Sequence, residues 1–428
     1  MQVYDGNEKS LSSFHDIQKF SVGPGKVLDF LSKSLHFNDE PRFPNYIAGL
    51  SKKTIIGAKN ENTIVGAIDL IDEKARVKTV IEGFERHSLF CPNGVRRTVF
   101  CKPAELSGNS MPIDLLVRVG QKYSKKEKKL VWTKAYDFFS KQEIYVPTQS
   151  VFLFYHYSEP RLFPLISTGA AAGTKYCGAT YRAICEILER DAFMIHFLNK
   201  LSPPHINADG LDENIDYILS KFKRYNLEVL MLDITTENKV PSFLSILIDS
   251  TGVGPYFTFG LKSDLNAIEA IKGSLLEAYQ GREWIREKMM DPKKKKIEID
   301  ATGFSSQLDR ALFWSDKRMQ NSLQFFMWGS KKTVTHSKNF RNDNKRLKTL
   351  LRMLSEVGTN RILFKDITCS HITDKRIKIV KVLMPQMQPL YLDEHFKCFT
   401  ERDINVPKLL GYKEKSYSEL NNVPQPFI

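Results

Sequence analysis

Several features that assign a protein to a class at once are missing from this sequence of 428 residues. It has no run of 18 or more apolar residues, so no membrane-spanning helix is expected. Its N-terminus, Met1 to Asp5, lacks the basic and then apolar pattern of a secretory signal peptide. We therefore expect a cytoplasmic protein that does not enter a membrane.

Cysteine is sparse, and the familiar cysteine and nucleotide motifs are absent. No two cysteines form a Cys-x-x-Cys pair or stand at zinc-finger spacing, so we interpret them as reduced and mostly buried thiols. The stretch from Gly169 to Lys175 is not a P-loop, because three residues separate its glycines and Thr precedes Lys. If the chain binds ATP, it does so with another fold. The cysteines are Cys91, Cys101, Cys177, Cys185, Cys369 and Cys398.

The chain is basic, with a formal net charge of +14. A basic surface can attract nucleic acid, acidic peptides or membranes. The lysines gather in short runs, at residues 125–129, 293–296 and 331–332, without the interleaved aromatic residues that a single-strand binder needs. We interpret these runs as solvated loops and expect neither nucleic acid nor a membrane as a partner.

Helical and strand-like patterns alternate along the whole chain, with no low-complexity linker between them. This alternation predicts a mixed α/β (α+β) protein with layers of sheet and packed helices. Amphipathic periodicity predicts helices over residues 73–89, 179–200, 215–224 and 266–288. Short apolar runs predict strands over residues 151–155, 229–232, 243–248, 361–365 and 377–383.

Two predicted helices each carry a pair of glutamates three positions apart: Glu82 with Glu85, and Glu186 with Glu189. Side chains at this spacing share one helix face, so the two charges repel unless a cation or a basic group lies between them. A third helix repeats the register with Glu277, followed by a glutamine three positions later. Because Mg²⁺ prefers a few carboxylates together with phosphate oxygens, the pattern predicts one Mg²⁺–nucleotide site with the four paired glutamates as metal ligands.

At these motifs the sequence resembles the YcaO family of ATP-dependent enzymes that activate peptide amides. The family joins a Glu-x-x-Glu-Arg helix to a later turn of small residues and a Glu-x-x-Glu-Arg-Asp-Ala helix. These correspond here to Glu82 to Arg86, Ser167 to Gly173 and Glu186 to Ala192. The likeness covers nearly the whole chain, so we expect a single YcaO domain over residues 1–428, with its core at 61–428, and a YcaO-type fold.

The resemblance implies ATP and Mg²⁺ as cofactors and points to the residues that contact them. Lys78, Arg182 and Lys200 stand where the family has Ser, Gln and Arg, and basic groups there can neutralise phosphate. The expected ATP-binding residues are Lys78, Glu82, Glu85, Arg182, Glu186, Glu189, Lys200, Glu277, Gln280 and Arg282.

Residues 190–194, residues 201–204 and the C-terminal tail resemble the azoline-forming branch, the streptolysin-type docking and cyclodehydratase subunits. The implied activity is ATP-dependent conversion of Cys, Ser or Thr in a ribosomally made precursor peptide to thiazoline or oxazoline, by phosphorylation of the amide oxygen. That branch ends in Pro-x-Pro-x-Pro, which Pro424 and Pro426 match, whereas Ile428 replaces the last proline. We expect the tail to be ordered at the catalytic cleft, where the Ile428 carboxylate assists proton transfer; a tail that covers an apolar patch is the alternative.

Because the resemblance uses the full length, we expect no fused leader-binding domain. The implied partners are then a separate E1-like docking subunit that captures the leader, the precursor peptide and a flavin-dependent azoline dehydrogenase, with a homodimer kept open. Two alternatives also stay open. One is another YcaO chemistry, thioamide or amidine formation, against which the proline tail argues. The other is a non-catalytic scaffold of a peptide-modifying complex.

Overall fold

The structure is a computed structural model in which residues 21–53, 55, 63–90, 98–106, 109–113, 129–153, 159, 162, 165–290, 304, 306–334, 340, 342–372, 376–394 and 397–427 are described. Contacts within the chain divide it into two compact units. The first unit comprises Met1–Ser34, Phe43–Ile187 and Arg341–Gln386, and the second comprises Leu35–Arg42, Leu188–Phe340 and Met387–Ile428. Within the described ranges no helix has the length and apolar character needed to cross a membrane.

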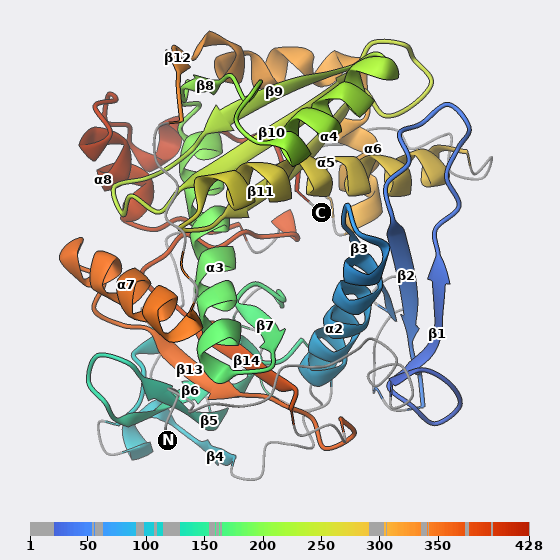
Figure 1. The fold of residues 1–428 in the computed structure, drawn as a ribbon. Coiled ribbons are helices and arrows are strands. Elements are labelled where there is room, and N and C mark those ends of the chain that lie inside the picture. The colour runs from blue at the N-terminus through green and yellow to red at the C-terminus, as the bar shows by residue number, and fades with distance from the viewer. Residues whose placement is uncertain are drawn as a thin grey trace. The chain divides into compact units, whose positions relative to one another are not determined.

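A three-stranded antiparallel sheet in the first unit is formed by β1 (Leu28–Lys33), β2 (Asn45–Leu50) and β3 (Ile64–Ile68), in that order. Helix α2 (Asp72–Phe90) packs on this sheet (Figure 1) through a buried face that includes Val80 and Phe84. Gly83 allows the close approach, because a Cβ at this position would lie 2.6 Å from Leu28 Cδ2. The sheet therefore fixes α2, which carries the first pair of glutamates.

A second antiparallel sheet of the first unit has the order β4-β5-β13-β14-β7, with β6 paired to β5. Gly169, which precedes β7, has a φ of +84°, and a Cβ there would collide with the carbonyl oxygen of Val382 on β14. Glycine is the residue that fits this backbone, and it holds the small-residue turn against β14. The strands are β4 (Val99–Cys101), β5 (Leu130–Asp137), β6 (Glu143–Pro147), β7 (Ala170–Gly173), β13 (Leu363–Asp366) and β14 (Lys378–Leu383).

Helix α3 (Tyr176–Leu198) runs from one unit into the other, with residues up to Ile187 in the first and residues from Leu188 in the second. Its apolar side chains, such as Ile184 and Phe193, are fully buried. The first unit also contains α7 (Asp343–Glu356), whose first turn is capped by the Asn342 side chain. The same unit includes the short 3-10 helices η3 (Pro103–Leu106) and η5 (Thr148–Ser150).

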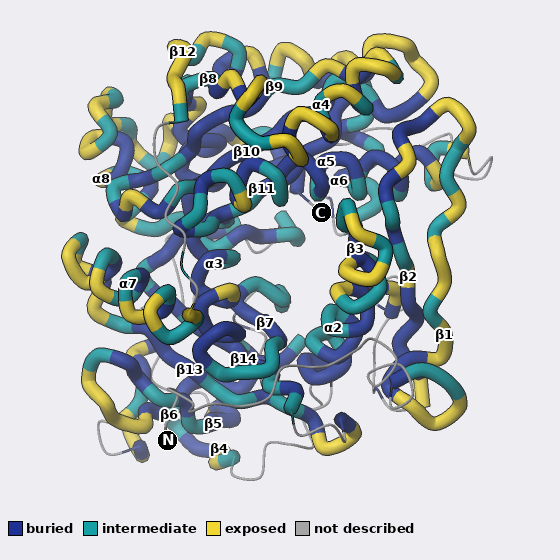
Figure 2. The backbone as a smooth tube through the Cα atoms, viewed as in Figure 1, coloured by how far each residue is buried: buried dark blue, intermediate teal, exposed yellow. Residues whose placement is uncertain are grey.

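The second unit is built on one sheet of five strands, in the order β11-β10-β9-β8-β12. Its pairs are antiparallel except β12 with β8. Helix α5 (Ala267–Met289) packs on β11 and β10, and α4 (Glu213–Arg224) packs on β9. In Figure 2 the strand β10 is largely coloured as buried, whereas α4 carries exposed segments. The strands are β8 (His205–Ile206), β9 (Leu227–Asp233), β10 (Ser242–Asp249), β11 (Phe257–Ser263) and β12 (Lys331–Lys332).

Aromatic side chains fill the core of the second unit. The Trp314 ring lies 6.1 Å from the Phe197 ring and 5.7 Å from the Phe259 ring, both edge to face. Such pairs add specificity beyond the area that they bury. The remaining helices of this unit are α6 (Gln307–Trp314), η7 (Lys317–Trp328), α8 (Arg402–Leu409) and η9 (Tyr417–Glu419).

The predicted mixed α/β class is confirmed, as are the four predicted helices and four of the five predicted strands. The prediction of a strand over residues 151–155 is wrong for residues 151–153, which form a turn and bend. Val151 and Phe152 are buried, but their backbone N–H groups both bond to the Thr148 carbonyl. The apolar side chains at the start of this run are therefore buried although their backbone is not extended. Residues 154 and 155 lie outside the described ranges.

Candidate functional site

Two glutamates of the first unit converge on the small-residue turn and the strand that follows it. Glu85 of α2 accepts a hydrogen bond from the Ala172 N–H of β7, at 3.0 Å. Glu186 of α3 accepts one from the Gly169 N–H, also at 3.0 Å. Each carboxylate keeps further lone pairs beyond this bond. The turn and β7 thus hold two carboxylates from two helices beside one another.

The charges of this cluster are not balanced among the glutamates themselves. Burial, followed by the negative charges of Glu186 and Glu82, raises the pKa of Glu85 to about 8. The Arg86 guanidinium lies 3.9 Å from the Glu82 carboxylate. Paired carboxylates that share a buried site push one of their protons to high pKa unless a cation joins them. The cluster therefore has the donor set and the charge deficit of a hard-cation site.

Lys381 of β14 is a site residue that the sequence analysis missed. Its ammonium group is fully buried and donates to the carbonyl oxygens of Ile166, Ser167 and Thr168, at 3.0, 3.2 and 2.7 Å. Burial lowers its pKa to about 8, against the attraction of Glu186 and Glu85. Lys381 thus fixes the turn by its three N–H bonds and places a positive charge near the carboxylates. A lysine inside an otherwise apolar strand was the signal that could have revealed it.

Two of the predicted phosphate-side residues also lie in the first unit. Arg182 of α3, an exposed residue, donates to the Ala172 carbonyl oxygen at 2.6 Å. Its guanidinium therefore sits on the same strand that binds Glu85. Lys78 of α2 pairs with Asp69 at 2.5 Å, and half of its side chain is exposed. Arg182 adjoins the carboxylate cluster, whereas Lys78 is engaged at the start of α2.

The second unit repeats the arrangement with the next two glutamates. Glu189 of α3 accepts a hydrogen bond from the Ser263 N–H at 3.0 Å, and Glu277 of α5 accepts one from the Leu261 N–H at 2.6 Å. Ser263 and Leu261 are alternate residues of β11 and so share one face of the strand. The Lys262 ammonium lies 3.7 Å from Glu189.

The other predicted residues of the second unit have varied surroundings. Arg282 of α5 is buried and donates to Glu40 at 2.9 Å and to Asp249 at 2.7 Å. Gln280 of α5 is half-buried. Lys200 follows α3, is exposed and has a φ of +50°. The structure therefore brings together Glu82, Glu85, Glu186 and Arg182 in the first unit, while the grouping of all four paired glutamates stays a prediction.

The proline tail is ordered up to Phe427 in the core of the second unit. Arg310 donates to the Gln425 carbonyl at 2.6 Å, and the Trp314 indole N–H donates to the Pro424 carbonyl at 3.0 Å. The Phe427 ring packs edge to face on Phe193, 4.7 Å between centroids. Residues 424–427 are therefore packed in the second unit, and the placement of the tail at the catalytic cleft stays a prediction; Ile428 lies outside the described residues.

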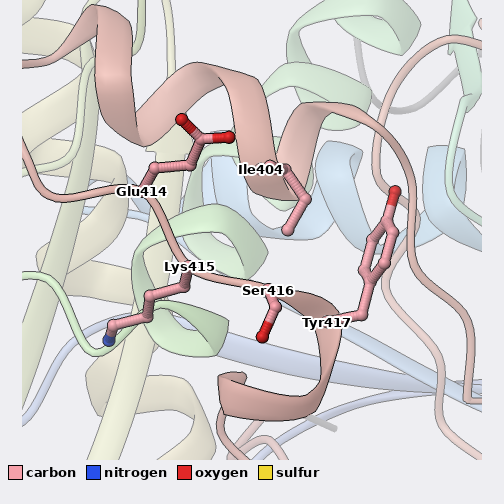
Figure 3. A pocket seen from close by; sticks show the side chains of 5 residues that line it. All are labelled: Ile404, Glu414, Lys415, Ser416 and Tyr417. Carbon is pink, nitrogen blue, oxygen red and sulfur yellow. The ribbon is translucent and has the colours of Figure 1, made fainter.

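A separate pocket in the second unit, of about 420 Å³, lies beside α8 (Figure 3). None of the predicted ATP-binding or metal-binding residues lines it. Its lining residues are Ile404, Glu414, Lys415, Ser416 and Tyr417. We therefore place the candidate site at the carboxylates and not at this pocket.

Comparisons with known proteins identify the family and the fold. A family model described as YcaO cyclodehydratase, ATP- and Mg²⁺-binding, matches residues 70–388. An uncharacterized protein of Methanothermobacter thermautotrophicus is 24% identical over 336 residues, which cover 75% of this chain and 80% of that protein. Because the family model matches most of the chain, this match identifies the family.

Several solved structures share the fold. A heterocyclase in complex with substrate and cofactor has a TM-score of 0.78 at 20% identity, covering 96% of this chain and 57% of its own. The YcaO protein of Methanopyrus kandleri bound with AMPPCP and Mg²⁺ has a TM-score of 0.64 at 14% identity, with coverage of 90% and 91%. The Escherichia coli microcin synthetase complex McbBCD scores 0.60 at 15%, with 83% and 88%. This chain thus spans little more than half the length of the first of these proteins.

Proposed function

The chain belongs to the YcaO family of ATP- and Mg²⁺-binding cyclodehydratases, and from this premise we propose that it forms azolines in a ribosomally made precursor peptide. The family, the enzyme class and the cofactors ATP and Mg²⁺ that the sequence predicted are confirmed by the family match. We propose, in addition, the azoline chemistry, the role as a subunit and the site residues.

The half-buried carboxylate cluster of the first unit is the observation that carries this proposal. Glu85 and Glu186 come from different helices and converge on one turn and strand, and burial, followed by the negative charges of Glu186 and Glu82, raises the pKa of Glu85 to about 8. Burying charges in this way is costly unless a cation compensates them. Their oxygens fit Mg²⁺, which takes one or two carboxylates with phosphate oxygens.

The chain's residues have separate tasks in this scheme. Glu82, Glu85, Glu186 and Glu189, the four ligands that the sequence predicts, would hold Mg²⁺, while Arg182 and Lys381 keep positive charge beside the phosphate side of the site. Bound ATP supplies the phosphoryl group that turns the amide oxygen into a leaving group. Catalysis is then mostly positioning and neutralisation of developing charge. We include Lys78, Lys200, Glu189, Glu277, Gln280 and Arg282 in the proposed nucleotide site on the family resemblance.

The reaction balances without an oxidant. The thiol or hydroxyl of Cys, Ser or Thr adds to the preceding amide carbon and loses its proton, and the former carbonyl oxygen accepts the terminal phosphoryl group of ATP. Phosphate leaves as the amide nitrogen loses its proton and the C=N bond of the ring closes. One ADP and one phosphate form for each ring, so both are usable readouts.

The tail and the partners complete the proposal. Pro424 and Pro426 fix the backbone of the last residues, so a rigid tail positions the Ile428 carboxylate to assist proton transfer. Capture of the precursor's leader falls to an E1-like docking subunit, and oxidation of azolines to azoles falls to a flavin-dependent dehydrogenase. The chain by itself should therefore cyclise full-length precursor only feebly, alone or as a homodimer.

The test is ATP turnover and ring formation with partner subunit and precursor present. Phosphate release and the loss of one water per ring, followed by mass spectrometry, should appear together in the wild type and disappear in Glu186→Gln. Replacement of oxygen by sulfur would indicate thioamide formation, and loss of water that does not need a Cys, Ser or Thr side chain would indicate amidine formation. Absence of ATP turnover from the complete, folded complex would overturn the enzymatic proposal and favour the scaffold.

A further inference from the structure

Three metal-ligating side chains of the first unit come together away from the glutamates. His87 lies near the end of α2, and Cys369 and His371 lie in the segment that follows β13. One ligand atom from each residue lies within 4.8 Å of the others. Cys369 Sγ is 3.6 Å from His371 Nδ1, and the two imidazole rings lie 5.4 Å apart, inclined by 70°.

His87 gives independent reason to expect a ligand at this cluster. Its side chain is fully buried, yet neither ring nitrogen has a hydrogen-bond partner among the described residues. Buried polar groups nearly always have a partner, because losing hydration without compensation is costly. Cys369 is buried as well, whereas His371 is exposed, so the cluster reaches from the core to the surface.

We propose that His87, Cys369 and His371 bind a zinc-class divalent ion. Two imidazoles and a thiolate are ligands that zinc favours, whereas Mg²⁺ prefers oxygen. Around one zinc ion the ligand atoms stand roughly 3.3–3.8 Å apart, given bond lengths of about 2.0–2.3 Å. The cluster reaches that spacing by a contraction of about 1 Å. Three protein ligands leave one tetrahedral position for water or a further ligand, and the Cys369 thiol releases its proton to solvent on binding.

This site is distinct from the proposed Mg²⁺ site, although both use α2. His87 is two residues beyond Glu85, and two residues correspond to about 200° around a helix. The side chains therefore leave α2 on nearly opposite sides. Zinc at His87 would join the end of α2 to the segment after β13, so its expected effect is to stabilise the first unit.

The experiment measures metal binding directly on the full chain, freed of any polyhistidine tag. One Zn²⁺ per chain should bind in equilibrium dialysis, in the presence of a large excess of Mg²⁺. Co²⁺ used as a spectroscopic probe should give a near-ultraviolet thiolate charge-transfer band together with tetrahedral d–d bands. Zn²⁺ should also raise the midpoint of thermal unfolding.

Variants assign the ligands. Cys369→Ser should abolish the cobalt thiolate band, and His371→Ala, at an exposed position, should weaken Zn²⁺ binding by about tenfold or more. Cys101→Ser, a buried cysteine of β4, is the matched control and should keep the band. Glu186→Gln should keep it too, which separates this site from the proposed function.

Three results would overturn the assignment: failure of the folded wild type to bind stoichiometric Zn²⁺, a cobalt spectrum without a thiolate band, or a band that survives Cys369→Ser. The circular dichroism spectrum of each variant shows whether lost binding reflects lost structure. Should Cys369→Ser unfold, the exposed His371→Ala variant still decides the assignment, because unchanged Zn²⁺ affinity in that protein contradicts it.

Discussion

Both units hold glutamates by hydrogen bonds from backbone N–H groups, but the charges around these glutamates differ. In the first unit Glu85 and Glu186 accept N–H bonds from Ala172 and Gly169, and in the second Glu189 and Glu277 accept them from β11. In both, glutamates from two helices are held by the backbone of a strand or of the turn before it, so neither arrangement depends on an ion for its geometry.

The charges nearby differ. Lys262 stands 3.7 Å from Glu189 with a half-exposed side chain, so it moves with little cost. Lys381 in the first unit is buried and uses its three N–H bonds on carbonyl oxygens. Burial and the neighbouring carboxylates nevertheless raise the pKa of Glu85 to about 8, so a bound cation would favour the ionised form of the first pair. The comparison teaches that a shared helix motif specifies where the carboxylates lie, while the neighbouring lysine decides how much they need a metal.

The largest effect is expected from removing one negative charge, either Glu186 in the first unit or Glu189 in the second. Glu186→Gln and Glu189→Gln should each lower ATP turnover by about 10²–10³-fold, because a neutral amide cannot hold Mg²⁺. Both variants should fold, since the glutamine carbonyl still accepts the backbone N–H bond. Phosphate release at saturating partner and peptide measures the loss.

The control for these two variants is Glu269→Gln, which changes an exposed glutamate of α5 that pairs with Lys272. ATP turnover of this control variant should be unchanged. A Glu189→Gln protein as active as the control would confine the metal site to the first unit. That result would make the second pair of carboxylates structural.

Substitution of Arg282 in the second unit distinguishes a role in stability from a role in ATP binding. Its guanidinium is buried between Glu40 and Asp249, and removal of one partner from a buried ion pair costs about 3–5 kcal/mol. Arg282→Met should therefore lose stability of that order in urea unfolding. A variant with wild-type stability that no longer binds ATP would instead show that Arg282 serves mainly as a phosphate contact.

The pH dependence of Mg²⁺ affinity should distinguish the first unit. With its pKa near 8, Glu85 is protonated at pH 6 and must lose that proton to bind the ion. Affinity should rise by about tenfold per pH unit from pH 6 to pH 8 and then level off. Calorimetry in buffers of different ionisation enthalpy should detect close to one proton released at pH 6–7. Proton release that persists in Glu85→Gln would contradict the assignment to Glu85.

The raised pKa of Glu85 also determines how the stability of the metal-free protein changes with pH. The folded pKa of Glu85 is raised above its ordinary value of 4.5, so its contribution to stability is full below about pH 4.5 and is lost as pH rises toward 8. Lys381 does not offset this change at pH 5–7, because its pKa, lowered to about 8, leaves it charged there. Thermal unfolding of the metal-free protein should show a Glu85-dependent decline over that window, which Glu85→Gln removes.

The smallest effect concerns the last residue. Residues 424–427 are part of the core of the second unit, so deletion of the whole tail would confuse stability with catalysis. Removal of Ile428 alone should lower cyclisation by roughly tenfold through a displaced carboxylate, with nucleotide affinity retained. Ile428→Pro should be tolerated, as the family pattern has proline there. Unchanged cyclisation after the deletion would rule out a catalytic tail.

Much of this protein could be predicted from local pattern. The helix boundaries at α2, α3, α4 and α5 agree with the amphipathic periodicity to within three residues, and the side chains of Asn266 and Asp212 cap α5 and α4. The register of Glu82 with Glu85 and of Glu186 with Glu189 is likewise local, because i,i+3 side chains share a helix face whatever the rest of the fold does. The family followed from the same motifs.

Tertiary structure decided what depends on contacts between distant segments. Burial alone did not make residues 151–153 a strand, and no spacing rule linked His87 of α2 with Cys369 and His371, which lie in one segment far along the chain. Lys381 acquired its lowered pKa only when β14 buried it against residues 166–168. Sequence by itself determined helix faces and their charges, because these repeat over a few residues; the fold decided which faces meet, because electrostatic and metal-ligand interactions act across space and not along the chain.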